Sequence, residues 1–483
     1  MSDSEKIATA APAPDAEILT AAPQQAEPDA NVMDEEDRLK PRFVAEVLDA
    51  VAAGDVETVH RLVEPLHPAD VADLIELARA DEREGLVAAL ADLVDADVLA
   101  EMNEHVRETL IDEMEPQQVA DLAGQLDTDD AVALIEDLEE DDQRAVLRAM
   151  EPDDRAAIEE ALTYGEETAG RLMQRELIAV PEHWTVGQVI DYLRSGAELA
   201  NDFWEVFVVS PDHHPVGTCR LSSILRAPRA TKVREIMQEE QTLIPVDMDQ
   251  EDVALRFQKY ALVSAAVVDG SGRLVGMITV DDVVHIIQEE ASEDVLLLSG
   301  AGEGDINEPV RESYKARVRW LMANLVTALV ASTVIRFFED SIERLAILAV
   351  LMPIVAGVGG NAGTQTLAVT VRALATNQLT GSNRWRAVGR EVRVALLNGI
   401  TIAVLVGIAV TLILGSRQLG AVIAAAMLFN ILIAGLAGVL VPLTLERLRA
   451  DPAVASSVFV TMVTDSMGFL IFLGLATAAG LTA

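Results

Sequence analysis

The stretch PIVAGVGGNAGTQ, residues 353–365, interrupts a long apolar segment with four glycines and two amides. Glycine weakens a helix, and an amide in hydrocarbon needs a hydrogen-bond partner. Such a stretch is tolerated at membrane depth only where it packs closely on protein or lines a wet cavity. Asn361 and Gln365 are four residues apart and share one helix face. The stretch therefore predicts either close helix packing, through the small-residue pair Gly359 and Gly363, or a polar surface inside a membrane protein.

A second polar interruption is Asp465, in the last apolar segment, residues 453–481. At 1.5 Å per residue it lies ~18 Å along that segment, near the centre of a bilayer. A carboxylate there costs about 2.5–3.5 kcal/mol on insertion scales, and such residues are usually functional. We expect Asp465 to be the only acid in the interior of a membrane segment, with no Lys or Arg at matching depth. A protonated carboxyl and a partner in another chain are the alternatives.

The charge of the chain is unevenly distributed. Residues 1–310 hold 22 basic and 71 acidic side chains, whereas the rest hold 14 and 8, and the whole chain has a net charge of −43. Nucleic-acid binding is disfavoured because phosphate repels an acidic surface. Divalent cations are the natural counterparts of carboxylates. The single cysteine, Cys219, excludes an internal disulfide and a thiolate metal cluster.

Five apolar segments are long enough to cross a bilayer. They cover residues 318–338, 345–374, 392–414, 419–443 and 453–481. Ten basic residues flank them on one side: Lys315, Arg317, Arg319, Arg372, Arg384, Arg386, Arg390, Arg393, Arg447 and Arg449. Three flank the other side: Arg336, Arg344 and Arg417. This bias predicts a multi-pass protein of the cell (inner) membrane, with its amino-terminal domains cytoplasmic and its carboxy terminus outside. In the fourth segment, Asn430 predicts a hydrogen bond between helices.

The first 168 residues divide into two parts. Residues 1–38 are rich in Ala, Pro, Asp and Glu, a composition that cannot bury a core and predicts a disordered acidic tail. Residues 39–168 carry apolar residues at three- and four-residue spacing, which indicates short helices. Several of these begin at an acid or at an X-Pro pair: His67-Pro68, Glu115-Pro116, Asp127-Thr128 and Glu151-Pro152. Their similarity predicts a small superhelical array.

Residues 169–294 contain an internal duplication with β-rich runs, a turn and a closing helix in each copy, 169–231 and 232–294. Matching dipeptides recur in the two copies: Met173-Gln174 with Met237-Gln238, and Val216-Gly217 with Val275-Gly276. This part resembles a tandem pair of CBS domains, a regulatory module that senses small ligands.

In CBS domains a Gly-x-x-Thr-x-x-Asp motif often meets a nucleotide ribose, and the second copy has Gly276, Thr279 and Asp282. The first copy departs from it, with Arg220 and Ser223 at two of these places. The resemblance therefore makes ATP a candidate ligand of one site at most. Asp282 also fits a plain helix cap with Thr279.

The stretch 353–365, together with Thr464-Asp465 and the following Gly468-Phe469, resembles the MgtE family of magnesium channels. The resemblance extends over nearly the whole chain. It implies a multi-domain protein: an all-α superhelical amino-terminal domain, an α/β tandem CBS pair and a five-helix α transmembrane domain. Residues 295–316 would form a connecting (plug) helix, and residues 317–483 the channel.

The resemblance gives Asp465 the ion-binding role in the pore. Five helices with one acid make a poor pore alone, so we expect a homodimer in the lipid bilayer, with the two Asp465 carboxylates beside the axis. Mg²⁺ gives up its waters reluctantly. A workable filter would hold a largely hydrated ion, and the backbone of Gly359 and Gly360 and the amide of Asn361 could supply outer-shell oxygens.

The resemblance also implies closure of the channel by cytoplasmic Mg²⁺ that bridges acidic side chains of the soluble domains. The positions that match regulatory ligands of the family are Asp97, Asp130, Asp249, Glu251, Asp282, Glu290, Glu293 and Asp294. Glu290, Glu293 and Asp294 share one helix face, where three like charges repel one another unless a cation or solvent relieves them. His285 stands where the family can carry an acid.

Two other functions remain open. One is transport of Mn²⁺, Co²⁺ or Ni²⁺, which soft or imidazole ligands would favour, although the apolar segments contain no His or Cys. The other is a nucleotide-gated regulator whose membrane part is only an anchor, which would leave Asp465 and the amides unexplained. An enzyme is disfavoured, because every His precedes Arg311 and the apolar segments contain no Ser/His or Cys/His set.

Overall fold

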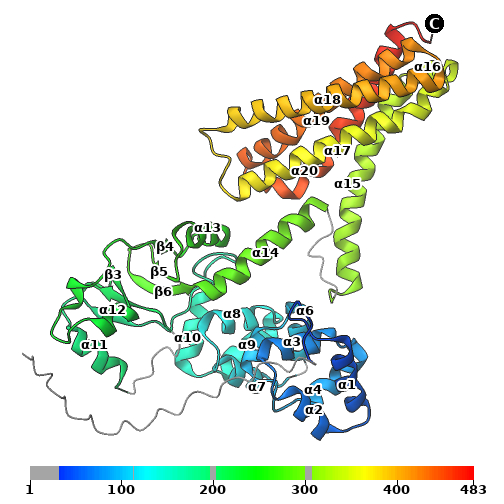
Figure 1. The fold of residues 1–483 in the computed structure, drawn as a ribbon. Coiled ribbons are helices and arrows are strands. Elements are labelled where there is room, and N and C mark those ends of the chain that lie inside the picture. Colours follow the sequence, from blue (N-terminus) through cyan, green and yellow to red (C-terminus); the bar gives the residue numbers. More distant parts are fainter. Residues whose placement is uncertain (1–31, 113, 196–202, 300–306, 483) are drawn as a thin grey trace, which may run out of the picture. The chain divides into compact units, whose positions relative to one another are not determined.

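The computed structural model of the chain describes residues 32–112, 114–195, 203–299 and 307–482 (Figure 1). Residues 1–31 of the predicted tail therefore lie outside the described part. The chain separates into two compact units, Met1–Thr163 and Tyr164–Ala483.

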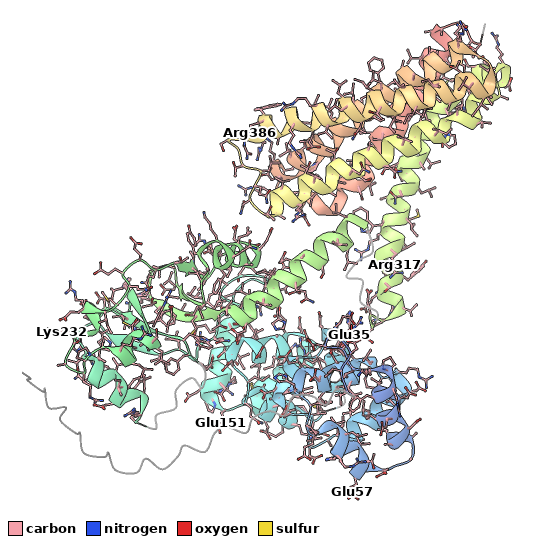
Figure 2. All side chains as sticks on the ribbon, viewed as in Figure 1. Glu35, Glu57, Glu151, Lys232, Arg317 and Arg386 are labelled. Carbon is pink, nitrogen blue, oxygen red and sulfur yellow. The ribbon has the colours of Figure 1, made fainter. Side chains whose placement is uncertain are left out.

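The first unit is built of short helices around one apolar core. The helices are α1 (Pro41–Ala52), α2 (Val56–Val63), α3 (Pro68–Leu77), α4 (Ala80–Ala89), α5 (Ala96–Ala100), α6 (Glu104–Ile111), α7 (Pro116–Ala123), α8 (Thr128–Glu136), α9 (Glu140–Ala149) and α10 (Pro152–Ala161). Helices α3, α7 and α10 begin at the proline of an X-Pro pair, as predicted, because proline is preorganised for the first helical turn. Acidic side chains such as Glu57 and Glu151 project outward from this unit (Figure 2).

The second unit begins with two small three-stranded sheets and their helices. The first copy holds β1 (Ala179–Pro181), α11 (Val186–Leu193), β2 (Glu205–Val209), β3 (Pro215–Arg220) and α12 (Leu221–Arg226). A 3₁₀ turn, η1 (Val233–Glu235), precedes the second copy, which holds β4 (Leu243–Pro245), α13 (Gln250–Tyr260), β5 (Ser264–Val268), β6 (Leu274–Thr279) and α14 (Val280–Ser299). In both sheets the first pair is parallel and the second antiparallel, with a bulge at the same place. The duplication read from the sequence is therefore confirmed.

The two copies exchange the segments that precede them. A Cβ on Gly276 in β6 would lie 2.7 Å from Sδ of Met173, and one on Gly217 in β3 would lie 2.7 Å from the carbonyl oxygen of Gln238. Backbone bridges join Gln174 to Met277 and Thr218 to Gln238. Each glycine thus leaves room for a chain segment that enters from the other copy, so the two copies interlock.

Five helices of the second unit are long and apolar enough to cross a membrane among the residues described. They are α15 (Val310–Arg336), α17 (Ile347–Ala375), α18 (Arg384–Leu414), α19 (Arg417–Arg447) and α20 (Pro452–Ala478), with the short α16 (Glu339–Arg344) between the first two. The predicted five-helix domain is confirmed. A guanidinium nitrogen of Arg384 lies 2.8 Å from a carboxylate oxygen of Glu446. This ion pair places the start of α18 and the end of α19 at the same end of the bundle.

Helices α17, α19 and α20 approach one another through glycines. A Cβ on Gly438 of α19 would lie 2.8 Å from the carbonyl oxygen of Gly363 in α17, and a Cβ on Gly363 would lie 2.7 Å from Cγ1 of Val460 in α20. Small residues let helix backbones come this close, and the resulting van der Waals contact drives helix association in lipid. The predicted packing role of the small-residue stretch is therefore confirmed.

The side chain of Asn430 lies at the junction of these three helices. It is fully buried in α19, and its Nδ2 donates a 2.9 Å hydrogen bond to the carbonyl oxygen of Val355 in α17. A Cβ on Gly359 of α17 would lie 2.1 Å from Nδ2, and one on Gly468 of α20 would lie 2.8 Å from it. The predicted hydrogen bond between helices is confirmed, and two glycines make the space for it.

We expect Gly359→Ala to destabilise the membrane domain, because the new methyl group would overlap the buried amide of Asn430. Overpacking of this kind costs about 1–3 kcal/mol. The matched control is Gly474→Ala in α20, where a Cβ meets no atom within 4 Å of the described chain. Thermal unfolding of each purified full-length variant in detergent would give its melting temperature. Equal melting temperatures for Gly359→Ala and the wild type would contradict the packing at Asn430.

Candidate functional site

One face of α17 carries polar and small residues that the chain leaves uncovered. Gly357, Asn361, Thr364 and Gln365 recur at helical spacing and are exposed, although α17 is one of the apolar helices. Exposed amides in a membrane segment need a partner other than lipid. This face is therefore either the wall of a wet cavity or a surface that another chain covers.

Asp465 lies on α20, next to a fully buried Thr464. Its side chain is half-buried, and it forms no ion pair or hydrogen bond with any part of the chain that the structure describes. Gly360 of α17 comes close to this place, since a Cβ there would lie 4.0 Å from Oγ1 of Thr464. The structure thus places the predicted Gly360 beside the residue that precedes Asp465, and it leaves Asn361 exposed. Gly359 instead faces Asn430, and its predicted contact with an ion stays a prediction.

A second carboxylate lies in the membrane helices. Glu391 is buried in α18 and accepts a hydrogen bond from Arg390. It lines a cavity of about 210 Å³ together with Gln365 of α17 and Asn398 of α18. Hydropathy does not indicate Glu391 as a membrane residue, because the apolar segment is expected to begin at residue 392, whereas α18 begins at Arg384.

Acidic side chains gather around α14 in the second unit. Burial raises the pKa of Glu290, and the carboxylates of Asp249, Glu167 and Glu289 raise it further, although a 2.6 Å hydrogen bond from Gln250 opposes the shift. Desolvation also raises the pKa of Glu293, and its charged neighbours there include Glu290, Glu167, Glu289 and Asp451. We call these six residues the acidic cluster: Glu167, Asp249, Glu289, Glu290, Glu293 and Asp451.

Three members of the acidic cluster were predicted, namely Asp249, Glu290 and Glu293. Glu167, Glu289 and Asp451 were not, because nothing in their spacing along the chain indicates that they meet. No group of three His, Cys, Asp or Glu side chains is close enough to hold a metal ion within the described ranges. The cluster is therefore a region of mutual repulsion and not a preformed chelate.

The other predicted regulatory residues lie elsewhere. Asp97 and Asp130 are exposed on α5 and α8 of the first unit, and Glu251 is half-buried in the first turn of α13. Oδ1 of Asp249 accepts a 3.0 Å hydrogen bond from the backbone N–H of Glu251 at the start of that helix. The side chain of Asp294 lies outside the described residues. The regulatory role of these positions stays a prediction.

The nucleotide motif of the second CBS copy makes contacts within the chain. Oδ2 of Asp282 accepts a 2.6 Å hydrogen bond from the hydroxyl of Thr279 and a 3.2 Å bond from Nε2 of Gln174. Gly276 packs against Met173. The helix-cap interpretation of Thr279 and Asp282 is confirmed, since Thr279 precedes the first residue of α14 and its backbone N–H donates a 3.3 Å hydrogen bond to Oδ2 of Asp282. ATP binding stays a prediction.

Family models match three parts of the chain. A divalent cation transporter model matches residues 352–475, an MgtE intracellular N domain model matches residues 66–167, and a CBS domain model matches residues 233–289. The first of these spans contains the glycine-rich stretch of α17 together with Asp465.

Several known proteins are similar over most of the chain. The magnesium transporter MgtE of Enterococcus faecalis is 35% identical over 80% of this chain and 85% of its own length. The magnesium transporter MgtE of Thermus thermophilus is 34% identical over 66% of this chain and 71% of its own length. Among solved structures, the cytosolic domain of the Mg²⁺ channel MgtE in complex with ATP is 28% identical, covers 50% of this chain and 99% of that one, and has a TM-score of 0.47.

We expect millimolar Mg²⁺ to raise the melting temperature of the full-length protein most strongly at neutral pH. A carboxyl whose pKa is raised by folding binds its proton more tightly in the folded chain, so stability falls as pH rises through that pKa. Mg²⁺ would relieve this repulsion only where the acids are ionised. The Mg²⁺-dependent increase should therefore shrink as pH falls toward the ordinary glutamate value of 4.5.

The matched comparison is Glu290→Gln/Glu293→Gln, which removes two charges of the acidic cluster. Its stabilisation by Mg²⁺ should be weak at neutral pH and change little on acidification. A wild-type response to Mg²⁺ at every pH in this variant would contradict the role of the cluster.

Proposed function

Since the chain belongs to the MgtE family of magnesium transporters, we propose that it takes up Mg²⁺ across the cell membrane through its five-helix domain. The observation that carries the proposal is Asp465, a carboxylate on an apolar helix with no partner in the described chain. A hydrated Mg²⁺ would compensate this charge without losing its inner waters. The oxygens of Asn361 and of the backbone at Gly359 and Gly360 would bind the outer shell of the ion.

We further propose that the working unit is a homodimer. In one chain the polar face of α17, with Asn361 and Gln365, is open, and Asp465 is only half-buried. Two-fold assembly would place these faces opposite one another across a shared axis, and it would line a pore with a carboxylate from each chain. Lipid could not satisfy the same groups, because it offers no hydrogen bonds at that depth.

Regulation by cytoplasmic Mg²⁺ is supported by the acidic cluster. Asp451 interacts with Glu293 of α14 and immediately precedes α20, the helix that carries Asp465. An ion that bridges these carboxylates would hold α14 against the start of α20. When the ion leaves, repulsion would separate the two, so binding at the cluster would close the channel and low Mg²⁺ would open it. We propose that Asp97, Asp130, Glu251, Asp282 and Asp294 contribute further ligands.

The orientation in the membrane follows from the arginines. The end of the bundle with the Arg384–Glu446 ion pair carries most of the basic flanking residues, and such residues concentrate on the cytoplasmic side. The soluble domains would then be cytoplasmic and the carboxy terminus outside.

The remaining alternatives concern the identity of the transported ion, the role of ATP and catalysis. Carboxylate and amide oxygens suit Mg²⁺ better than Co²⁺ or Ni²⁺, which prefer nitrogen or sulfur ligands. ATP at the CBS pair would modulate the channel. We propose no catalytic activity.

We expect Asp465→Asn to abolish Mg²⁺ flux, because the amide keeps the shape of the side chain but cannot balance the charge of the ion. The measurement is Mg²⁺ uptake into liposomes that contain the purified protein. Asp340→Asn, an exposed acid of α16, is the matched control and should transport normally. Wild-type uptake by a well-folded Asp465→Asn protein would remove this carboxylate from the mechanism.

We expect Glu290→Gln/Glu293→Gln/Asp294→Asn to keep conducting when internal Mg²⁺ is high. The three substitutions remove the repulsion that a bridging ion would relieve, and with it the preference of Mg²⁺ for the closed arrangement. Flux is measured against graded Mg²⁺ inside the liposomes.

The matched control removes three exposed acids from the segment around and after η1, Glu235→Gln/Glu239→Gln/Glu240→Gln. It should retain inhibition by internal Mg²⁺. If both triple variants close like the wild type, the sensor lies outside the acidic cluster, although the transport proposal would still stand.

A further inference from the structure

A basic cavity lies at the end of the bundle where α17 passes into α18. Its volume is about 670 Å³, and four arginines line it: Arg372 from α17 and Arg386, Arg390 and Arg393 from α18. None of the residues that line it in the described chain is acidic. This concentration of positive charge contrasts with a chain whose net charge is −43.

The three arginines of α18 share one helix face, because they are spaced by four and then three residues. Arg372 and Arg386 have no ion pair in the described ranges, and Nε of Arg393 donates only to the carbonyl oxygen of Gly389. Arg390 donates a hydrogen bond to the carboxylate of Glu391. The start of α18 adds the positive end of a helix dipole to this field.

Arg384, two residues before Arg386, does have an acidic partner. Arg384 is paired with Glu446, at distances of 2.8 and 2.9 Å from one of its nitrogens to the two carboxylate oxygens. Three of the four arginines that line the cavity, Arg372, Arg386 and Arg393, have no ion pair in the described chain. Like charges gathered in this way favour an anion with several acceptor oxygens, and guanidinium groups match phosphate by paired hydrogen bonds.

The surroundings of the cavity indicate where that phosphate comes from. Trp385 is 78% exposed at the start of α18, and tryptophan is enriched at the level of lipid headgroups. About one and two turns beyond Arg393, Leu397 and Ile400 are exposed on the same helix. Figure 2 shows Arg386 at the end of α18, at the tip of the membrane helices. A ligand here would have its phosphate among arginines and apolar chains along α18.

We propose that this cavity binds the headgroup of an anionic phospholipid, such as phosphatidylglycerol. The guanidinium groups of Arg372, Arg386 and Arg393 would bind the phosphate, and the acyl chains would lie on the exposed apolar face of α18. Basic pockets between membrane helices are known to take such headgroups. This binding does not depend on Mg²⁺ transport and would be present in a chain that carries no ion.

The test uses the full-length protein in mild detergent, with native mass spectrometry to count phosphatidylglycerol and phosphatidylcholine bound at graded lipid concentrations. Arg386→Gln/Arg393→Gln should weaken phosphatidylglycerol binding by ~30-fold, at about 1 kcal/mol per arginine. Phosphatidylcholine binding should not change. The matched control is Arg336→Gln/Arg417→Gln, which removes two exposed arginines that do not line the cavity and should bind phosphatidylglycerol like the wild type. Melting temperatures of both pairs confirm that they fold.

Two results would overturn the proposal. Equal losses in the two double variants would show that the arginines act only as general surface charge, and no loss in either would show that they do not bind the lipid. Displacement of phosphatidylglycerol by millimolar inorganic phosphate would assign the cavity to a soluble phosphate and not to a lipid. Failure of inorganic phosphate to compete, together with loss in Arg386→Gln/Arg393→Gln alone, supports the lipid site.

Discussion

The membrane domain depends on one constraint, which is that every polar group at bilayer depth must find its partner in protein or trapped water. The Nδ2 group of Asn430 meets this constraint by donating a hydrogen bond to the carbonyl oxygen of Val355, and Gly359 and Gly468 make room for the side chain. The three helices that meet at this amide therefore pack closely. The same packing holds α20 against α17 and so determines the position of Asp465.

In the acidic cluster, by contrast, like charges lie close together and repel one another. Its carboxylates are close enough to raise the pKa values of Glu290 and Glu293, yet they form no ready chelate in the described chain. Such a region stores electrostatic repulsion, which a divalent cation or protons can relieve. Because Asp451 belongs to the cluster and directly precedes α20, that repulsion bears on the helix of Asp465. Under the proposed regulation, a change in ion occupancy at the cluster would act directly on the start of α20.

Much of this architecture could be predicted from the sequence, because apolar length and helix-start chemistry are local signals. The five membrane helices, the X-Pro helix starts and the hydrogen bond of Asn430 all follow from them. Glu391 was missed because the first turns of α18 are polar, so hydropathy places the start of the helix too late. The exchange of segments between the CBS copies was also hidden, since Met173 matches Met237 in sequence whichever sheet it contacts. The acidic cluster joins residues from four separate parts of the chain, and only the fold brings them together.

Asn430 favours one helix arrangement in this bundle and also carries a free-energy cost. Its Nδ2 is bonded, but its Oδ1 is buried and has no hydrogen-bond partner in the described chain. A buried acceptor without a donor costs about 1–3 kcal/mol. An apolar side chain of the same size would avoid that cost, but it could not bond the carbonyl oxygen of Val355, four residues before Gly359. The amide of Asn430 therefore favours this register of α17 against α19 over shifted registers, although its unbonded Oδ1 lowers the stability of the folded protein. That register is what keeps the polar face of α17 turned outward from the junction, where an ion or a second chain can reach it.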